Sequence, residues 1–422
     1  MTKTNDLTEG KVSRTLLGFF FPMLFTNLLQ QLYTFADTAI VGKGLGDNAL
    51  AAVGNMSALT LLIIGFAQGI TNGFSVIVAQ HFGSRDMSAL RKSIAASIKL
   101  SAILSVILTV ISLIFLKSVL LIIQTDAAIL KDSLIYGYIL FGGLTATMAY
   151  NLCSCILRAL GDSKTPFLAI VVSSILNILL DCLFIFVLKT GVGGAAIATV
   201  LAQLVSAVIC VIRLRKTESI QLTHEDFKSD FSLSVKLLKN GIPMAFMNSI
   251  TAVGCMIVQS YVNVLGVAYT SAYSACNRYV NLFMLPSVTA GFAVSAFTSQ
   301  NYGAKKYNRI RSGVRVGLMI GLVSYLVLGT AMVLFPQELA KVFLNGQEPI
   351  ALAANFLRIC GSMFLTLNFL FVYRSTVQGI CPICEQTFIT YPSKRQVYCS
   401  KQCAGKARWV HVSQCNDVSD HG

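Results

Sequence analysis

The chain has 422 residues, of which 55% are hydrophobic and only 12% are charged. Soluble domains usually carry about 25% charged residues, so this composition excludes an ordinary soluble globular protein and indicates lipid-facing surface. The net charge of +15 is typical of membrane proteins whose basic loops lie on the cytoplasmic side, and alone it does not favour nucleic-acid binding.

Ten apolar stretches along the chain are long enough to cross a bilayer, which takes about 20 helical residues. The first follows a polar N-terminal segment and continues past the length of a signal-peptide core, so we predict a retained span. Open sheet edges cannot face lipid, and each stretch is therefore predicted as a helix. The predicted spans are approximately residues 16–41, 52–79, 93–116, 134–157, 166–188, 193–213, 242–264, 268–297, 313–335 and 350–378.

Basic residues alternate between the predicted connections. The second connection carries Arg85, Arg91 and Lys92, and the fourth carries Arg158 and Lys164, whereas odd-numbered connections hold few Lys or Arg. Because basic loops stay on the cytoplasmic side, we predict a multi-pass protein of the cytoplasmic (inner) membrane. Both termini are predicted to be cytoplasmic.

The sequence also repeats itself. Residues 80–85 (QHFGSR) match residues 300–305 (QNYGAK) at an offset of 220, Pro22-Met23 match Pro243-Met244 at 221, and Gly143 and Gly161 match Gly361 and Gly379 at 218. Copies that both begin on the cytoplasmic side are parallel repeats, related by an axis along the membrane normal.

These patterns predict an all-α polytopic membrane protein made of two parallel six-helix repeats. The second repeat is reduced to four helices, because no apolar run that could span a membrane follows residue 380. We predict a first bundle with its cytoplasmic linker at 1–240, a partial second bundle at 241–380, and a Cys-rich tail at 381–422.

Asp37 and Asp181 are the acidic residues inside the predicted spans. A charge near the centre of a membrane helix costs about 2.5–3.5 kcal/mol, so such residues usually mark function. Helical spacing places Asp37 on one face with Asn27, Gln30 and Thr34. The same spacing groups Asp181 with Ser174 and Asn177 on one face of the fifth span.

Two carboxylates with an amide and a hydroxyl can bind a hard cation through oxygen atoms, or exchange a proton. The alternative is that Asp37 caps the outer helix end in water and that Asn177 bonds only a neighbouring helix. Four polar residues are candidates for a substrate cavity: Asn27, Gln30, Thr34 and Gln259.

Four sequence stretches, residues 35–42 (FADTAIVG), 45–46 (LG), 49–54 (ALAAVG) and 79–84 (AQHFGS), resemble the multidrug and toxic compound extrusion (MATE) family. The resemblance covers about residues 8–380. It implies twelve helices in two bundles and export of mostly cationic, amphiphilic compounds in exchange for sodium ions or protons. In the archaeal and DinF-like branches, the cation site has matching residues here in Asp37, Asn177, Asp181 and Thr199.

The tail has a different composition from the rest of the chain. Its paired cysteines, Cys381 with Cys384 and Cys399 with Cys403, have the spacing of a tetrahedral Zn²⁺ site, and the segment resembles small treble-clef zinc fingers. The alternative is an unstructured tail with four free thiols. Five scattered basic residues in the tail allow nucleic-acid contact but do not favour it.

The leading hypothesis is therefore a secondary antiporter that exports amphiphilic, mostly cationic drugs in exchange for sodium ions or protons by alternating access. Its expected partners are membrane lipid and these small molecules. No enzyme is predicted, and no phosphate-binding Gly-rich loop indicates ATP drive. One alternative is an inactive or repurposed membrane-tethered zinc module from an interrupted transporter gene. Another is a lipid or lipid-linked-sugar flippase, which is disfavoured by the two internal acids and by the presence of Arg278 as the most evident internal cation.

Overall fold

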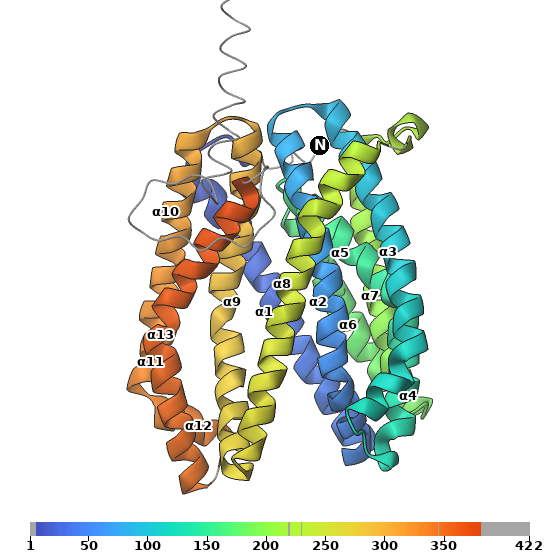
Figure 1. Cartoon of the computed structure of the whole chain (residues 1–422), viewed down its shortest axis with the longest axis vertical. Helices are drawn as coiled ribbons and strands as arrows, with labels where there is room; N and C mark the ends of the chain where they lie inside the picture. The colour runs from blue at the N-terminus through green and yellow to red at the C-terminus, as the bar shows by residue number, and fades with distance from the viewer. Residues whose placement is uncertain (1–5, 218–219, 229, 345, 381–422) are drawn as a thin grey trace, which may run out of the picture.

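The computed structural model describes residues 6–217, 220–228, 230–344 and 346–380, and every regular element in these ranges is helical (Figure 1). The four cysteines of the predicted zinc finger lie outside the described residues. The elements are α1 (Val12–Leu45), α2 (Asp47–Gly83), α3 (Met87–Ile122), α4 (Ala127–Gly142), α5 (Leu144–Ala159), α6 (Lys164–Cys182), the π-helical turn η1 (Leu183–Val187), α7 (Val192–Arg215), the 3₁₀ turn η3 (His224–Phe227), α8 (Phe231–Val264), α9 (Val267–Gly303), α10 (Tyr307–Ser324), the π-helical turn η4 (Tyr325–Gly329), α11 (Thr330–Leu334), α12 (Pro336–Phe343) and α13 (Gln347–Ile380).

The number of predicted spans is confirmed for the described residues. Nine helices are long and apolar enough to cross a membrane, and the bent pair of α4 and α5 makes a tenth. The fourth predicted span is thus one segment with a 46° bend. The break falls at Gly143, where a side chain would lie 2.4 Å from Val200 on α7.

The helices form two halves, and α1 and α8 cross between them (Figure 1). The first part of α1 packs in the second half, where Phe19 shares a core with Phe297 of α9. The last part of α1 packs in the first half through Val41. Conversely, Leu237 near the start of α8 shares a core with Phe74 of α2. Because of this exchange, each half contains one core cluster that includes a helix of the other half.

Structural features recur along the chain at a nearly constant spacing. The helices α8, α9, α10 and α13 begin 219 or 220 residues after α1, α2, α3 and α4. The backbone conformation recurs as well, since Gly46 (φ 85°) and Arg85 (φ 60°) are followed 220 residues later by Gly266 (φ 104°) and Lys305 (φ 58°). These left-handed conformations each allow a tight turn between two long helices.

The two halves meet most closely where α2 crosses α9. A β-carbon on Gly83 would lie 1.9 Å from the carbonyl oxygen of Gln300, and one on Gly303 would lie 1.9 Å from that of Gln80. The glutamine side chains then reach across: Gln80 Nε2 donates to the Gly379 carbonyl (3.2 Å) and Gln300 Nε2 donates to the Ala159 carbonyl (2.6 Å). We call Gln80, Gly83, Gln300 and Gly303 the latch.

The N-terminal segment Asp6–Gly10 lies over the latch. The Leu7 N–H donates to Gln300 Oε1 (3.0 Å), and Leu7 is fully buried. Beyond α9, Lys306 and Arg309 donate to backbone carbonyls of this segment, while Arg85 forms an ion pair with Glu9 (2.6 Å). The segment therefore ties the α2–α3 turn to the α9–α10 turn.

The linker between the halves is held against α3 through Asp226. The Thr223 backbone N–H donates to Asp226 Oδ2 (2.8 Å) and holds the pKa of this buried carboxyl below its usual value. The Thr223 hydroxyl and Arg91 Nε on α3 (3.5 Å) lower the pKa further.

The latch predicts that a methyl group at either glycine is harmful. Gly83→Ala and Gly303→Ala each force a backbone shift, and overpacking of this kind typically costs about 1–3 kcal/mol. Both variants should therefore lower the midpoint of thermal unfolding in detergent, followed by circular dichroism. The control is Gly54→Ala, also on α2, where a β-carbon meets nothing within 4 Å. Equal midpoints in all three variants would contradict the close crossing.

The depressed pKa of Asp226 makes linker docking dependent on pH. Stabilisation by a carboxylate with a lowered pKa is present at neutral pH and is lost as the pH falls through the folded-state pKa. At pH 7.5, Asp226→Asn should therefore release the linker and speed tryptic cleavage after Lys216 and Lys228. Glu225→Gln is the matched control, because the ion pair that Glu225 forms within the described part of the chain is with the exposed Lys228. A cleavage rate unchanged by Asp226→Asn would show that the carboxylate does not hold the linker.

Candidate functional site

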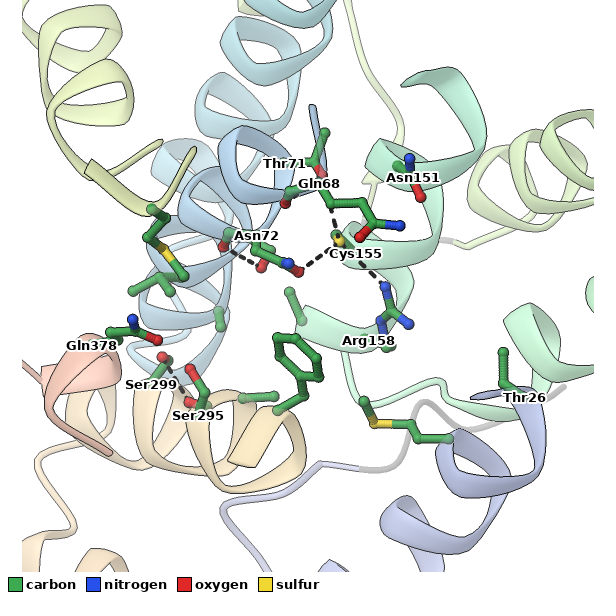
Figure 2. A pocket seen from close by; sticks show the side chains of 18 of the residues that line it. Thr26, Gln68, Thr71, Asn72, Asn151, Cys155, Arg158, Ser295, Ser299 and Gln378 are labelled. Carbon is green, nitrogen blue, oxygen red and sulfur yellow. Dashed lines mark hydrogen bonds between the residues drawn. The ribbon is translucent and has the colours of Figure 1, made fainter. Parts of the chain in front are cut away.

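A cavity of about 120 Å³ lies between the two halves, next to the latch (Figure 2). Two of the four predicted cavity residues, Asn27 and Gln30 of α1, line it. The other two, Thr34 and Gln259, are not among its lining residues. Thr34 is exposed and donates its hydroxyl to the Gln30 carbonyl (2.8 Å). The polar residues of α1 therefore do not share one environment, since Asn27 and Gln30 face the cavity and Thr34 is exposed.

The cavity is lined by matching positions of the two halves. Five pairs of lining residues are each separated by 220 positions: Asn72 and Phe292, Ser75 and Ser295, Val76 and Ala296, Ala79 and Ser299, Arg158 and Gln378. Helices α2 and α5 supply the first member of each pair, and α9 and α13 supply the second. The backbone arrangement is similar on both sides, while the side chains differ.

Arg158 is the one charged side chain among the described residues that line this cavity. Its Nη2 donates to Cys155 Sγ (3.3 Å), and the Cys155 thiol donates to Asn72 Oδ1 (3.2 Å). The sequence interpretation assigned Arg158 to a cytoplasmic connection because the predicted span ended at residue 157. Helix α5 instead continues to Ala159. Helical spacing from Asn151 and Cys155 was the signal that could have placed Arg158 on their face.

The four predicted coupling residues lie in the first half. Asp37 is on α1, Asn177 and Asp181 are on α6, and Thr199 is on α7. Asp37 is 9% exposed and Asp181 is fully buried, and their carboxyl groups are near enough to interact electrostatically. Asn177 and Thr199 line one small cavity of about 10 Å³. Burial of Asp37 disfavours the alternative in which this residue caps a helix end in water.

Several oxygen atoms at this site have no hydrogen-bond partner among the described residues. They are Asp37 Oδ1, both carboxylate oxygens of Asp181, Asn177 Oδ1 and Ser174 Oγ. A buried polar group without a partner costs about 1–3 kcal/mol, and more when it is charged. The oxygen-rich set fits a hard cation such as Na⁺. Protonation of a carboxyl group would also neutralise the charge.

Arg278 does not line the central cavity. Its guanidinium is exposed and lies 5.5 Å from the ring centroid of Phe343 on α12. This cation–π contact accounts for its position on the outer face of α9.

Comparisons with known proteins agree with this architecture. The MatE family profile matches residues 22–183 and 243–382. The probable multidrug resistance protein YoeA of Bacillus subtilis is 30% identical over 84% of this chain and 79% of its own length. The FAD transporter of Shewanella oneidensis is 23% identical over 90% and 85%, respectively. A solved outward-facing structure of a multidrug resistance MATE transporter superposes with a TM-score of 0.84 at 25% identity, over 90% of this chain and 85% of that one.

Proposed function

Since the chain belongs to the MATE family of transporters, we propose that it exports small molecules by ion-coupled alternating access. Members of this family are multi-pass membrane transporters and not enzymes. Relatives named as multidrug resistance proteins support drug efflux. The proposed coupling ion, sodium or a proton, and the antiport mechanism go beyond these similarities.

The observation that carries the coupling proposal is the set of unsatisfied oxygens around Asp37 and Asp181. A monovalent cation or a proton bound there would remove one unit of negative charge from two buried, interacting carboxyl groups. Asn177 and Thr199 would orient or complete the site. Release of the ion would leave repelling charges in a low-dielectric interior, so the filled and empty states favour different arrangements of α1 and α6.

The first helix offers a means of rearrangement. Pro22 lies inside α1, and a proline removes one helical hydrogen bond and permits bending. The Thr26 hydroxyl donates to the Pro22 carbonyl (2.8 Å), which also loosens the regular backbone pattern. We propose that bending here couples ion binding to exposure of the cavity. The nearby Gly18 is not explained by close packing of small residues, because a β-carbon there would meet nothing within 4 Å.

Membrane orientation and repeat organisation are part of the same proposal. The recurrence of helix starts and left-handed residues at 219–220 positions supports two parallel repeats, at 1–240 and 241–380. The latch lies at the end of the molecule that carries the basic connections, which we propose is the cytoplasmic side of the inner membrane. In the described arrangement that end is closed.

The substrates are proposed to be amphiphilic. Multidrug resistance relatives support a range of drug-like compounds, for which the resemblance predicts a mostly cationic character. FAD is a large dinucleotide with anionic phosphates, so the transporter of this molecule indicates that substrate charge differs among the relatives. The expectation of cationic substrates therefore stays a prediction.

Asp37→Asn should abolish efflux without loss of membrane insertion, because an amide cannot exchange a proton and binds a cation weakly. The measurement is uptake into inverted vesicles driven by an imposed Na⁺ or pH gradient, and the gradient that drives uptake identifies the ion. Asp132→Asn on α4 is the matched control and should retain wild-type rates. Drug resistance unchanged in cells that carry Asp37→Asn would sink the proposal.

We also propose that Cys381, Cys384, Cys399 and Cys403 bind one Zn²⁺. Native mass spectrometry of the intact chain should show one zinc, and replacement of Cys381 and Cys384 by Ser should remove it. A wild-type mass without metal after growth in zinc would contradict this assignment. Transport that persists without zinc would separate the tail from the efflux function.

A further inference from the structure

We propose that the central cavity binds the anionic head group of an amphiphile, with Arg158 as the residue that selects for negative charge. The inference rests on the proposed export function, because it assigns the substrate class of that cavity. It departs from the expectation of cationic substrates that the family resemblance gives.

The wall of the cavity carries a positive charge. Arg158 is half-buried in the wall, and no carboxylate lines the cavity among the described residues. The nearby Asp162 is not its counter-ion. One oxygen of Asp162 accepts from Arg213 Nε (3.1 Å) and the other accepts backbone N–H groups of Lys164 and Thr165. A buried charge is stable only when it is paired or well hydrogen-bonded. An anion in the cavity would therefore supply the guanidinium of Arg158 with a counter-charge and hydrogen-bond acceptors.

Arg158 and Asn151 both have N–H groups available to a ligand in the cavity. A guanidinium has five N–H donors, and Arg158 donates to a thiol sulfur, which is a weak acceptor. Asn151 lies two turns earlier on α5, lines the same cavity and is 8% exposed, and its Nδ2 has no partner among the described residues. Figure 2 shows Asn151, Cys155 and Arg158 along α5, with Asn72 reaching Cys155 from α2. Arg158 and Asn151 therefore offer the cavity N–H donors beyond those used in the described hydrogen bonds.

The charged residue and several apolar residues lie on different sides of the cavity. The first half supplies the charged Arg158, whereas the second half supplies no charged side chain among the described residues: its lining consists of the apolar Met244, Phe292 and Ala296 and the uncharged polar Ser295, Ser299 and Gln378. The charged head of an amphiphile would therefore lie toward Arg158, with Phe292 and Ala296 available to its apolar body. Sites that enclose a whole drug-sized ligand measure about 300–1,000 Å³, so a cavity of about 120 Å³ fits a head group. Carboxylate and phosphate both match a guanidinium geometrically.

Binding tests the inference separately from transport. The purified full chain in lipid nanodiscs is titrated with two dansyl probes of equal chain length, one ending in a carboxylate and one in a quaternary ammonium. We expect the carboxylate probe to bind at least tenfold more tightly. Arg158→Gln should remove that preference. This substitution introduces the residue type found at the corresponding position of the second half, Gln378. Arg158→Lys retains the charge and should retain at least part of it.

Two further measurements complete the test. Dodecyl phosphate should displace the carboxylate probe, whereas inorganic phosphate at the same concentration should not, because the apolar wall contributes to binding. Asn151→Asp leaves Arg158 in place and puts a carboxylate beside it, so this variant should lose the anion preference even if Arg158→Gln does not fold. Tighter binding of the ammonium probe by the wild type, or an unchanged preference in both Arg158→Gln and Asn151→Asp, would overturn the inference. Normal anion binding without transport would overturn the proposed function instead.

Discussion

The crossing of α2 and α9 at Gly83 and Gly303 is the constraint on which the rest of the structure depends. Each glycine allows the backbone of the other helix to approach where any side chain would collide with a carbonyl oxygen. Only at that distance can Gln80 and Gln300 each reach the end of a helix in the opposite half. The fully buried Gln300 also receives the N–H of Leu7, so the N-terminal segment depends on the same contact. One end of the molecule is closed by backbone packing and buried amide bonds, and the central cavity lies directly beside it.

The cavity combines a nearly symmetric backbone with asymmetric side chains. Positions 220 apart face it from both halves, yet Asn72 and Arg158 on one side correspond to Phe292 and Gln378 on the other. Exchange of a few side chains therefore changes the chemistry of the cavity without disturbing the crossing that shapes it. This separation of scaffold from lining explains how relatives with this architecture can be named for substrates as different as drugs and FAD.

Much of the fold follows from the sequence because the bilayer imposes it. Lengths of apolar runs predicted the ten spans, and spacing along α6 predicted that Asn177 and Asp181 would share a face. The bend at Gly143 was not predicted, because hydropathy does not register a close contact with Val200 on a distant helix. The prediction that Arg158 lies in a cytoplasmic connection was wrong for a related reason. From sequence alone, a basic residue at the end of an apolar run is assigned to the following loop, and only tertiary packing shows what surrounds it. Thr34 has the right spacing for the polar stripe but is exposed, because α1 leaves one half and enters the other along its length.

The path of α1 from one half to the other also limits how the central cavity and the site around Asp37 can influence each other. Gln30 lines the cavity and Asp37 lies seven residues further along the same helix, about 10 Å away at 1.5 Å per residue. Near the cavity, Asn27 Nδ2 donates to Thr289 Oγ1 of α9 (2.7 Å), which anchors α1 to the second half. Around Asp37, the same helix packs against α6 of the first half. A relative movement of the halves must therefore bend or shift α1 between these two anchors. A change of charge at Asp37 acts on one end of the segment that a substrate in the cavity contacts at the other, so the proposed coupling requires no longer pathway through the protein.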